Sequence, residues 1–361
     1  MRRRIGIKRL VRVAVLLVAM ALTAAGCSSS GDSDVDKSEP TGGVVVKPAR
    51  ATWSTGYFQA AIYSELLREL GYESSDASTN EVSADLFYPA AALGELDYWA
   101  NGWFPNAEET LTTPLADGGT VGDLVRPIGH EVRSGVVQGF LIDKATADKH
   151  SITSLRQIVE DEKLRKLFDA DEDGTADIFG CDKGWNCAEI TNETISLNGW
   201  QDRLTQIQGS YDALFVGDVR PRIGMGKPTL YYTWTPNYTS AQLVPGRDVV
   251  WLDLGGESVP GQGDPTSLPD GVCTGDPCLT GYTPSDIRVA ANDEFLQQHP
   301  QIEALFEAVE IPIDDISKQN LAMFNGADSQ SDIDKAARQW IADNREQVDS
   351  WLAGARARGD V

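Results

Sequence analysis

Residues 170–190 read ADEDGTADIFGCDKGWNCAEI, and within them Cys181 and Cys187 bracket a short loop that carries Trp185. A tryptophan of a hydrophobic core more often lies inside a periodic apolar run, as Trp340 does in DIDKAARQWIADNREQVDSWL. A large apolar side chain on a tied, glycine-containing loop indicates a binding position, and burial in the core is the simpler alternative.

The chain around this loop alternates between short β-branched runs and amphipathic stretches. Its first example is GGVVVKPARATWS, residues 42–54, followed by GYFQAAIYSELLRELGY, residues 56–72, whose apolar residues have helical spacing. Ser54 or Thr55 is the candidate N-cap of this helix, and Gly71 is the candidate for its C-terminal end. Because strands that alternate with helices form parallel sheets covered on both faces, the sequence predicts an α/β fold.

Three tryptophans share the same local context. Trp103 lies in WANGWFPN, Trp185 lies in the bracketed loop, and Trp234 lies in LYYTWTPN, each beside a proline or glycine. Ligands of α/β sheets collect at the loops that follow the carboxyl ends of strands. The shared position therefore favours a binding role for all three side chains together.

The N-terminus has the order of an export signal. Residues 1–12 carry six basic side chains and no acidic one. Residues 13–26 form an apolar run that ends in small side chains, and this run is shorter than the roughly 20 residues that span a bilayer. The exit sequence LTAAGC resembles a bacterial lipoprotein processing site, so residues 1–27 are expected to comprise a signal peptide and the lipobox Cys27, which is lipid-modified and becomes the first residue of the mature chain. An ordinary cleavage site with an incidental cysteine is the alternative. Polar residues 28–43 are expected to form a flexible tether.

The other four cysteines form two close pairs, Cys181 with Cys187 and Cys273 with Cys278. In an exported chain such pairs persist as disulfides. Metal ligation is the alternative, but no histidine or further cysteine lies near either pair in the sequence.

Charge and motif content exclude several classes of function. Removal of the signal peptide takes away six of 31 basic residues and leaves a net charge of −29, which argues against nucleic-acid binding. The three histidines are not part of a zinc-protease motif, and no Gly-x-Ser-x-Gly elbow occurs. The sequence therefore predicts neither an enzyme nor a cofactor.

At FDADEDGTADIFGCDKGWNC, YYTWTPN and PGRDVVWLDL the chain resembles the substrate-binding proteins of bacterial glycine betaine/proline betaine ABC importers. The resemblance implies a type II periplasmic-binding-protein fold, with two α/β lobes, two crossover segments and ligand in the cleft. We expect residues 44–137 plus 249–361 to form lobe 1 and residues 138–248 to form lobe 2.

The same resemblance implies a ligand site. Trp103, Trp185 and Trp234 would surround a quaternary ammonium, because aromatic faces attract a cation that has no N–H to donate. The backbone N–H groups of Asn186 and Cys187 would bind the ligand carboxylate.

This chain departs from the family pattern at one position. The first tryptophan of the family belongs to Trp-x-Pro-x-His, and here Ala107 stands in place of the histidine, which helps to bind the carboxylate. Three alternatives follow: Asn106 substitutes for the histidine, the carboxylate is held more weakly, or the ligand is a different quaternary amine. Trp53 is a further candidate wall. Of Tyr231 and Tyr232, strand alternation predicts that one faces the core.

The expected function is capture of a quaternary ammonium solute, glycine betaine or proline betaine, for osmoprotectant uptake. The expected partners are an ABC permease and its ATPase, and the expected location is the extracytoplasmic face of the cell membrane, reached through the lipid anchor only. Two alternatives stay open: a choline- or carnitine-binding protein of the same fold, and a carbohydrate-binding lipoprotein, since tryptophans also stack on sugars.

An acidic run precedes the bracketed loop. Its residues match positions 1, 3, 5, 6 and 9 of a calcium-binding EF-hand loop: Asp169, Asp171, Asp173, Gly174 and Asp177. Position 12, where a bidentate glutamate belongs, is Gly180. The sequence leaves open whether the run binds calcium or forms an aspartate-rich turn.

Overall fold

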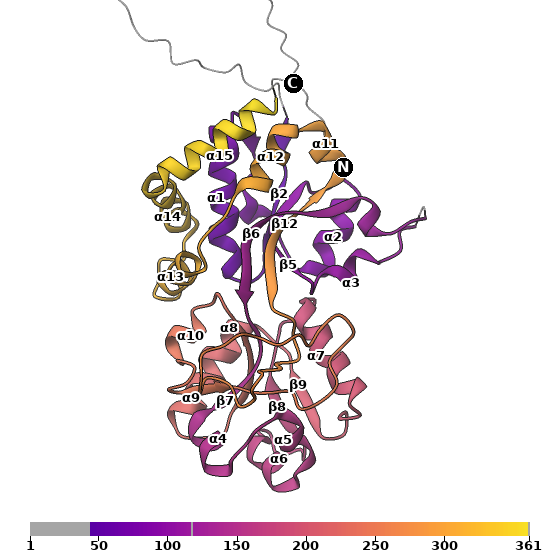
Figure 1. Cartoon of the computed structure of the whole chain (residues 1–361), viewed down its shortest axis with the longest axis vertical. Helices are drawn as coiled ribbons and strands as arrows, with labels where there is room; N and C mark the ends of the chain where they lie inside the picture. Colours follow the sequence, from indigo (N-terminus) through magenta and orange to yellow (C-terminus); the bar gives the residue numbers. More distant parts are fainter. Residues whose placement is uncertain (1–43, 117, 360–361) are drawn as a thin grey trace, which may run out of the picture. The chain divides into compact units, whose positions relative to one another are not determined.

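The computed structural model describes residues 44–116 and 118–359. The expected signal peptide, lipid-modified Cys27 and tether lie outside these residues. Within them the chain forms two five-stranded sheets covered by helices (Figure 1). No helix of the described part combines the length and the apolar character that crossing a bilayer requires.

The first sheet has the strand order β4-β2-β5-β12-β6. Its strands, in that order, are Glu81–Val82, Pro48–Ala51, Tyr98–Phe104, Ser285–Asn292 and Val125–Val136. The helices of this lobe are α1 (Thr55–Glu69), α2 (Ala84–Ala92), α3 (Glu108–Leu111), α11 (Asp293–Gln298), α12 (Pro300–Ala308), α13 (Ile313–Phe324), α14 (Gln330–Asp343) and α15 (Arg345–Ala357). A small parallel pair, β1 (Val45–Val46) and β3 (Glu73–Ser74), accompanies them.

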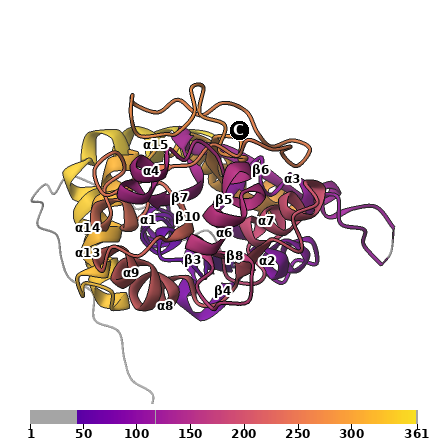
Figure 2. The ribbon, with the colours of Figure 1, turned by 90° about the horizontal axis from the view of Figure 1, so that it is seen from below.

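The second sheet has the order β11-β7-β10-β8-β9. Its strands, in that order, are Val249–Trp251, Gln138–Asp143, Leu230–Trp234, Ala176–Phe179 and Leu204–Ile207. Its helices are α4 (Lys144–His150), α5 (Leu155–Glu160), α6 (Glu162–Phe168), α7 (Asn186–Leu197), α8 (Tyr211–Leu214), α9 (Arg220–Gly224) and α10 (Thr239–Gln242). Figure 2 views the chain from this side, with α4 and α6 in front of the strands.

Each sheet is mixed, where the sequence predicted parallel sheets. In the first sheet β12 runs antiparallel to both of its neighbours, β5 and β6, and in the second sheet β7 runs antiparallel to β10 and β11. The reversed strand is in each case the first strand of its sheet after the chain has crossed from the other lobe. A strand that enters its sheet from the opposite lobe runs against the strands that begin within the sheet's own βα units.

The chain first passes from one sheet to the other between Val136, where β6 ends, and Gln138, where β7 begins. The second boundary differs. It was expected between residues 248 and 249, yet β11 pairs with β7, with Trp251 opposite Leu141. The chain returns to the first sheet only at Ser285, where β12 begins. The run RDVVWLDL shows that a strand forms but not which sheet it joins.

Helix α1 follows its sequence pattern. Phe58, Ile62 and Leu66, spaced four residues apart, are buried in the core cluster that also contains Tyr98 and Ala100 of β5. Ser54 occupies the N-cap position, and Gly71, just after the C-cap, has a φ of +94° that glycine adopts without strain. This helix begins directly after the loop that joins it to β2, and that loop forms part of the pocket described next.

Candidate functional site

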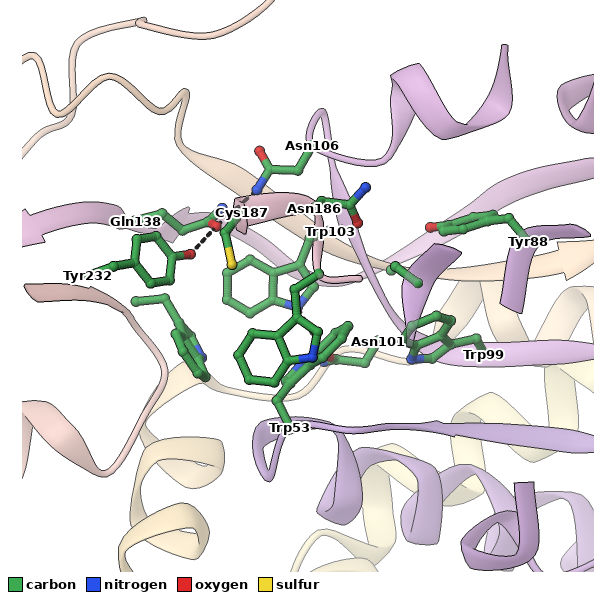
Figure 3. Close-up of a pocket in the computed structure, with 14 residues that line it drawn as sticks. Trp53, Tyr88, Trp99, Asn101, Trp103, Asn106, Gln138, Asn186, Cys187 and Tyr232 are labelled. Atoms are coloured by element: carbon green, nitrogen blue, oxygen red, sulfur yellow. Dashed lines mark hydrogen bonds between the residues drawn. The ribbon is translucent and has the colours of Figure 1, made fainter. Parts of the chain in front are cut away.

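Tryptophans from both lobes line one pocket (Figure 3). Trp53 lies between β2 and α1, Trp103 lies near the end of β5, Trp185 directly precedes α7, and Trp234 ends β10. The three tryptophans predicted as a group, and the further candidate Trp53, are therefore brought together. The pocket is lined by Trp53, Ala84, Tyr88, Trp99, Asn101, Gly102, Trp103, Asn106, Gln138, Trp185, Asn186, Cys187, Tyr232 and Trp234.

The indole rings meet at steep angles. Trp103 and Trp234 are 6.4 Å apart with an interplanar angle of 88°, and Trp234 and Trp185 are 5.7 Å apart at 80°. Trp185 and Trp53 are 5.2 Å apart at 70°. Edge-to-face contacts of this kind are favourable because the positive ring edge meets the negative face of its neighbour. The four rings therefore form one aromatic cluster that runs from Trp103 through Trp234 and Trp185 to Trp53.

Asn101 orients the two indoles of the first lobe. Its Oδ1 accepts the indole N–H of Trp53 at 2.6 Å and that of Trp103 at 2.9 Å. The two hydrogen bonds fix both rings and use both indole donors. Asn101 was not predicted, because nothing in WANGWFPN distinguishes it from other polar residues of a strand end.

The two indoles of the second lobe are held by the loop before α1 and by the first residue of that helix. Trp185 donates its indole N–H to Thr52 Oγ1 at 2.8 Å, and Trp234 donates to Thr55 Oγ1 at 3.1 Å. Thr55 Oγ1 in turn donates to the carbonyl of Pro236 at 3.0 Å. All four indole donors of the cluster are therefore used within the protein, which leaves the π systems to contact a ligand.

The bracketed loop has the disulfide that its spacing predicted, Cys181–Cys187, and the chain also forms Cys273–Cys278. Gly184, just before the tryptophan, has a φ of +88°. A Cβ at this position would also lie 2.9 Å from Asp85 Oδ1 of the first lobe. Glycine therefore permits both the turn and the close approach of the other lobe, and Trp185 follows directly.

Helix α7 begins at the pocket. Asn186 and Cys187 are its first two residues, so their amides have no carbonyl partner within the helix. Their N–H groups lie at the positive end of the helix dipole, where an anion is favoured. The side chain of Asn186 donates to Thr110 Oγ1 at 3.0 Å and so contacts the first lobe.

A polar network lies beside these amides. Gln138 Oε1 accepts from the Tyr232 hydroxyl at 2.7 Å and from Asn106 Nδ2 at 2.9 Å, while Gln138 Nε2 donates to Ser285 Oγ at 3.2 Å. Gln138 is the first residue of β7 and Ser285 is the first residue of β12, the two strands that the chain enters after crossing between the lobes. Sequence reasoning missed Gln138, although a polar residue in the apolar run VVQGFLI was a signal that could have been followed.

Asn106 and Ala107 occupy different environments. Asn106 lines the pocket, whereas Ala107, which replaces the family histidine, is 1% exposed and is not a lining residue. Of the neighbouring tyrosines of β10, one lines the pocket and the other packs in the core, as the alternation of side chains along a strand predicted. Tyr232 lines the pocket, and Tyr231 packs against Phe215 with ring centroids 6.1 Å apart.

None of the 14 residues that line the pocket carries a formal charge. Burial raises the pKa of Tyr232 well above its ordinary value, with smaller contributions from Tyr282 and Tyr211, so its hydroxyl stays protonated and donates to Gln138. A neutral pocket with aromatic walls at one side and free amides at a helix start is suited to a small molecule that carries both a cation and an anion.

Comparisons with known proteins agree with this geometry. A family model described as the substrate binding domain of ABC-type glycine betaine transport systems matches residues 44–343. The glycine betaine-binding periplasmic protein OusX of Dickeya dadantii strain 3937 is 38% identical over 328 residues, which cover 88% of this chain and 92% of that protein. The glycine betaine/proline betaine-binding periplasmic protein of Escherichia coli K12 is 34% identical over 327 residues, with the same coverage.

Solved structures share the fold. An ABC-transporter choline binding protein in complex with choline has a TM-score of 0.65 at 15% identity, over 86% of this chain and 92% of that one. Lactococcal OpuAC, closed and complexed with glycine betaine, has a TM-score of 0.61 at 15% identity, over 85% and 99%. The architecture is thus the expected type II periplasmic-binding-protein fold. The chain belongs to the family of substrate-binding domains of ABC-type glycine betaine transport systems, whose members are transport proteins and not enzymes.

Proposed function

We propose that this chain binds glycine betaine or proline betaine in a cage formed by Trp53, Trp103, Trp185 and Trp234. The observation that carries the proposal is the cluster of steeply angled indoles, all of whose N–H donors are used within the protein. A trimethylammonium group offers no hydrogen-bond donor, and aromatic faces attract its diffuse charge, with about 2 kcal/mol for a desolvated contact.

The carboxylate of the ligand is bound at the start of α7. The amides of Asn186 and Cys187 supply the donors, and the helix dipole adds a favourable potential without a mobile counter-charge. Asn106 lines the same pocket, next to position 107, where the family has a histidine. The absence of a charged lining residue suits a zwitterion, whose net charge is zero.

Choline is the second candidate ligand. It shares the trimethylammonium group but has a hydroxyl in place of the carboxylate. Ala107 stands where the family has the histidine that helps to bind a carboxylate, and it is buried outside the pocket lining, so a ligand without a carboxylate loses nothing by the change. Carnitine falls in the same class. A sugar is less suited, because sugar sites need many polar side chains around the stacking ring, and the lining here is dominated by aromatic residues.

Calorimetric titration of the mature chain with glycine betaine, proline betaine, choline, carnitine, glycine and maltose tests the proposal. Saturable binding of the methylated ammonium compounds, with no binding of glycine or maltose, is the expected result. Tighter binding of choline than of either betaine would assign the second candidate. Binding of maltose alone would overturn the cage.

The proposed physiological role is delivery of this ligand to an ABC permease and its ATPase. Membership of a transport family and the export signal support this role. We place the protein on the extracytoplasmic face of the cell membrane, attached only through a lipid on Cys27. Fractionation and sizing of the protein from cells that produce Cys27→Ser test the anchor. The change should block lipid attachment and the normal processing, so a variant that stays membrane-bound and is processed as before would refute the anchor.

A further inference from the structure

The acidic run before the bracketed loop folds into a cluster at the corner between α6 and β8. Within the part of the chain that the structure describes, one carboxylate oxygen from each of Asp169, Asp171 and Asp177 lies within 4.8 Å of the others. Asp169 is the C-cap residue of α6, and Asp177 lies in β8. Three carboxylates at this distance repel one another in the absence of a cation.

The loop that joins these residues is folded around its own aspartates. Asp169 accepts the amide N–H groups of Asp173 and Gly174, at 3.0 and 2.9 Å. Asp173 Oδ1 accepts the amide and the hydroxyl of Thr175, at 2.8 and 2.7 Å. Gly174 makes the turn with a φ of +98°, at the position where an EF-hand loop has its glycine.

Asp177 gives an independent indication of a ligand. Its side chain is 1% exposed, and its Oδ2 accepts the amide of Ala170 at 2.6 Å, but its Oδ1 accepts no hydrogen bond from any described residue. A buried carboxylate oxygen without a partner is costly, and a bound cation removes that cost.

No basic side chain supplies the missing positive charge. Among residues 44–116 and 118–359, no lysine, arginine or histidine forms an ion pair with Asp169, Asp171 or Asp177. The donor set consists of oxygen atoms only, which are the ligands that hard cations prefer.

We infer that Asp169, Asp171 and Asp177 bind one calcium ion at the corner between α6 and β8. Calcium fits a flexible loop of carboxylates and carbonyls better than magnesium, which demands near-ideal octahedral geometry. Gly180 supplies no carboxylate at the twelfth position, so the site lacks the bidentate ligand of an EF-hand and belongs to the weak extracellular range, with a Kd of about 10⁻⁴ to 10⁻³ M.

The site lies away from the ligand pocket. Asp177 is the second residue of β8, and the bracketed loop follows the other end of that strand. The ion joins the end of α6 to the sheet of the second lobe, so its effect is on the stability of that lobe. This inference does not depend on the identity of the transported solute.

The test is calorimetric titration of the mature, chelator-treated chain with CaCl₂ at constant ionic strength, together with melting curves in chelator, CaCl₂ and MgCl₂. We expect one saturable site per chain, a higher Tm in CaCl₂ than in chelator, and a smaller rise in MgCl₂. Absence of saturable heat at millimolar calcium would overturn the inference, and so would an equal rise of Tm in the two salts.

Two variants separate the site from the general acidity of the surface. Asp171→Asn changes an exposed member of the cluster and is expected to weaken calcium binding at least tenfold. Glu172→Gln is the matched control, since it removes the same charge from the adjacent exposed residue, which is not a member of the cluster. It is expected to leave the Kd within about twofold. Equal losses in the two variants would show diffuse cation binding and overturn the site.

Discussion

The side chain of Trp185 shows how one residue combines two requirements of the pocket. Its indole N–H is bound to Thr52 of the other lobe, and its ring meets those of Trp53 and Trp234 at steep angles. A ring held in this way before the ligand arrives loses little freedom on binding, which lowers the entropic cost of complex formation.

Replacement of Trp185 by alanine should weaken glycine betaine binding by about 2 kcal/mol, roughly thirtyfold in Kd, because one aromatic face is lost from a desolvated site. Trp185→Phe should retain part of the affinity, since a smaller face remains. Calorimetric titration measures both. Trp340→Ala is the control, because Trp340 stacks on Trp351 outside the pocket. Equal affinities of Trp185→Ala and the wild type would contradict the cage.

Glu131 is a second residue with a measurable consequence. It is 1% exposed, and burial raises its pKa to about 8, although the nearby Gln59 and Tyr63 side chains lower it in part. In the unfolded chain Glu131 ionises near its ordinary value of 4.5, while in the folded chain it stays protonated up to about pH 8. Its contribution to the free energy of unfolding therefore falls as the pH rises between these values, by about 1.4 kcal/mol per pH unit.

Glu131→Gln should abolish this part of the pH dependence, because an amide does not titrate. Urea denaturation at pH 5 and pH 7.5 should show a loss of stability in the wild type that exceeds the loss in the variant by about 3 kcal/mol. Glu95→Gln, at an exposed glutamate, controls for the loss of a surface charge. Parallel behaviour of Glu131→Gln and the wild type would show that Glu131 is already ionised in the folded protein.

At the scale of the element, the bracketed loop is a short closed ring of chain that ends in the first turn of α7. The entropy model of disulfides assigns small stabilisation to short loops, near the low end of the usual 2–4 kcal/mol. The larger effect of the Cys181–Cys187 bridge is therefore expected on the orientation of Trp185 and of the free amides behind it.

Replacement of Cys181 and Cys187 by serine should weaken glycine betaine binding about tenfold while the melting temperature changes little, since the bridge orders one ring and two amides. The matched control replaces Cys273 and Cys278, whose bridge closes a loop of similar length in the segment between β11 and β12. That control should leave the affinity unchanged. A collapse of the fold in the first variant, or equal affinity losses in both, would refute the division of roles.

The elements also show what could be predicted from sequence. Helix α1 and the three strand-end tryptophans were predicted because their signals are local: apolar spacing, capping residues and turn formers. The direction of β7 and β12 and the sheet that β11 joins were not, because these depend on pairing between distant segments. Asn101 escaped notice for the same reason, since its partner Trp53 lies 48 residues away.

At the scale of the whole molecule, the two lobes meet through hydrogen bonds at the pocket itself. Thr52 and Thr55, in one short stretch of the first lobe, accept the indole N–H groups of Trp185 and Trp234. The indoles proposed as the walls of the cage therefore also join the two lobes, so we expect ligand affinity and lobe contact to depend on the same side chains.

Thr52→Val keeps the shape of the side chain but removes the acceptor for Trp185. We expect a loss of about 1 kcal/mol of binding free energy, roughly fivefold in Kd, because a buried indole donor is left without a partner. Titration with glycine betaine measures the loss. Thr79→Val, in the turn of residues 77–80, is the control. An unchanged Kd for Thr52→Val would show that the contact does not contribute to the liganded state.

The crowding of indoles in one pocket has an optical consequence. Five of the nine tryptophans of the chain line it: Trp53, Trp99, Trp103, Trp185 and Trp234. Neighbouring rings of this group have centroids 5.2 to 6.4 Å apart, which is close enough for them to exchange excitation energy. A cation seated among them would perturb the emission of more than half of the protein's tryptophans at once, and the native chain should report its own occupancy by colour and intensity without any attached dye.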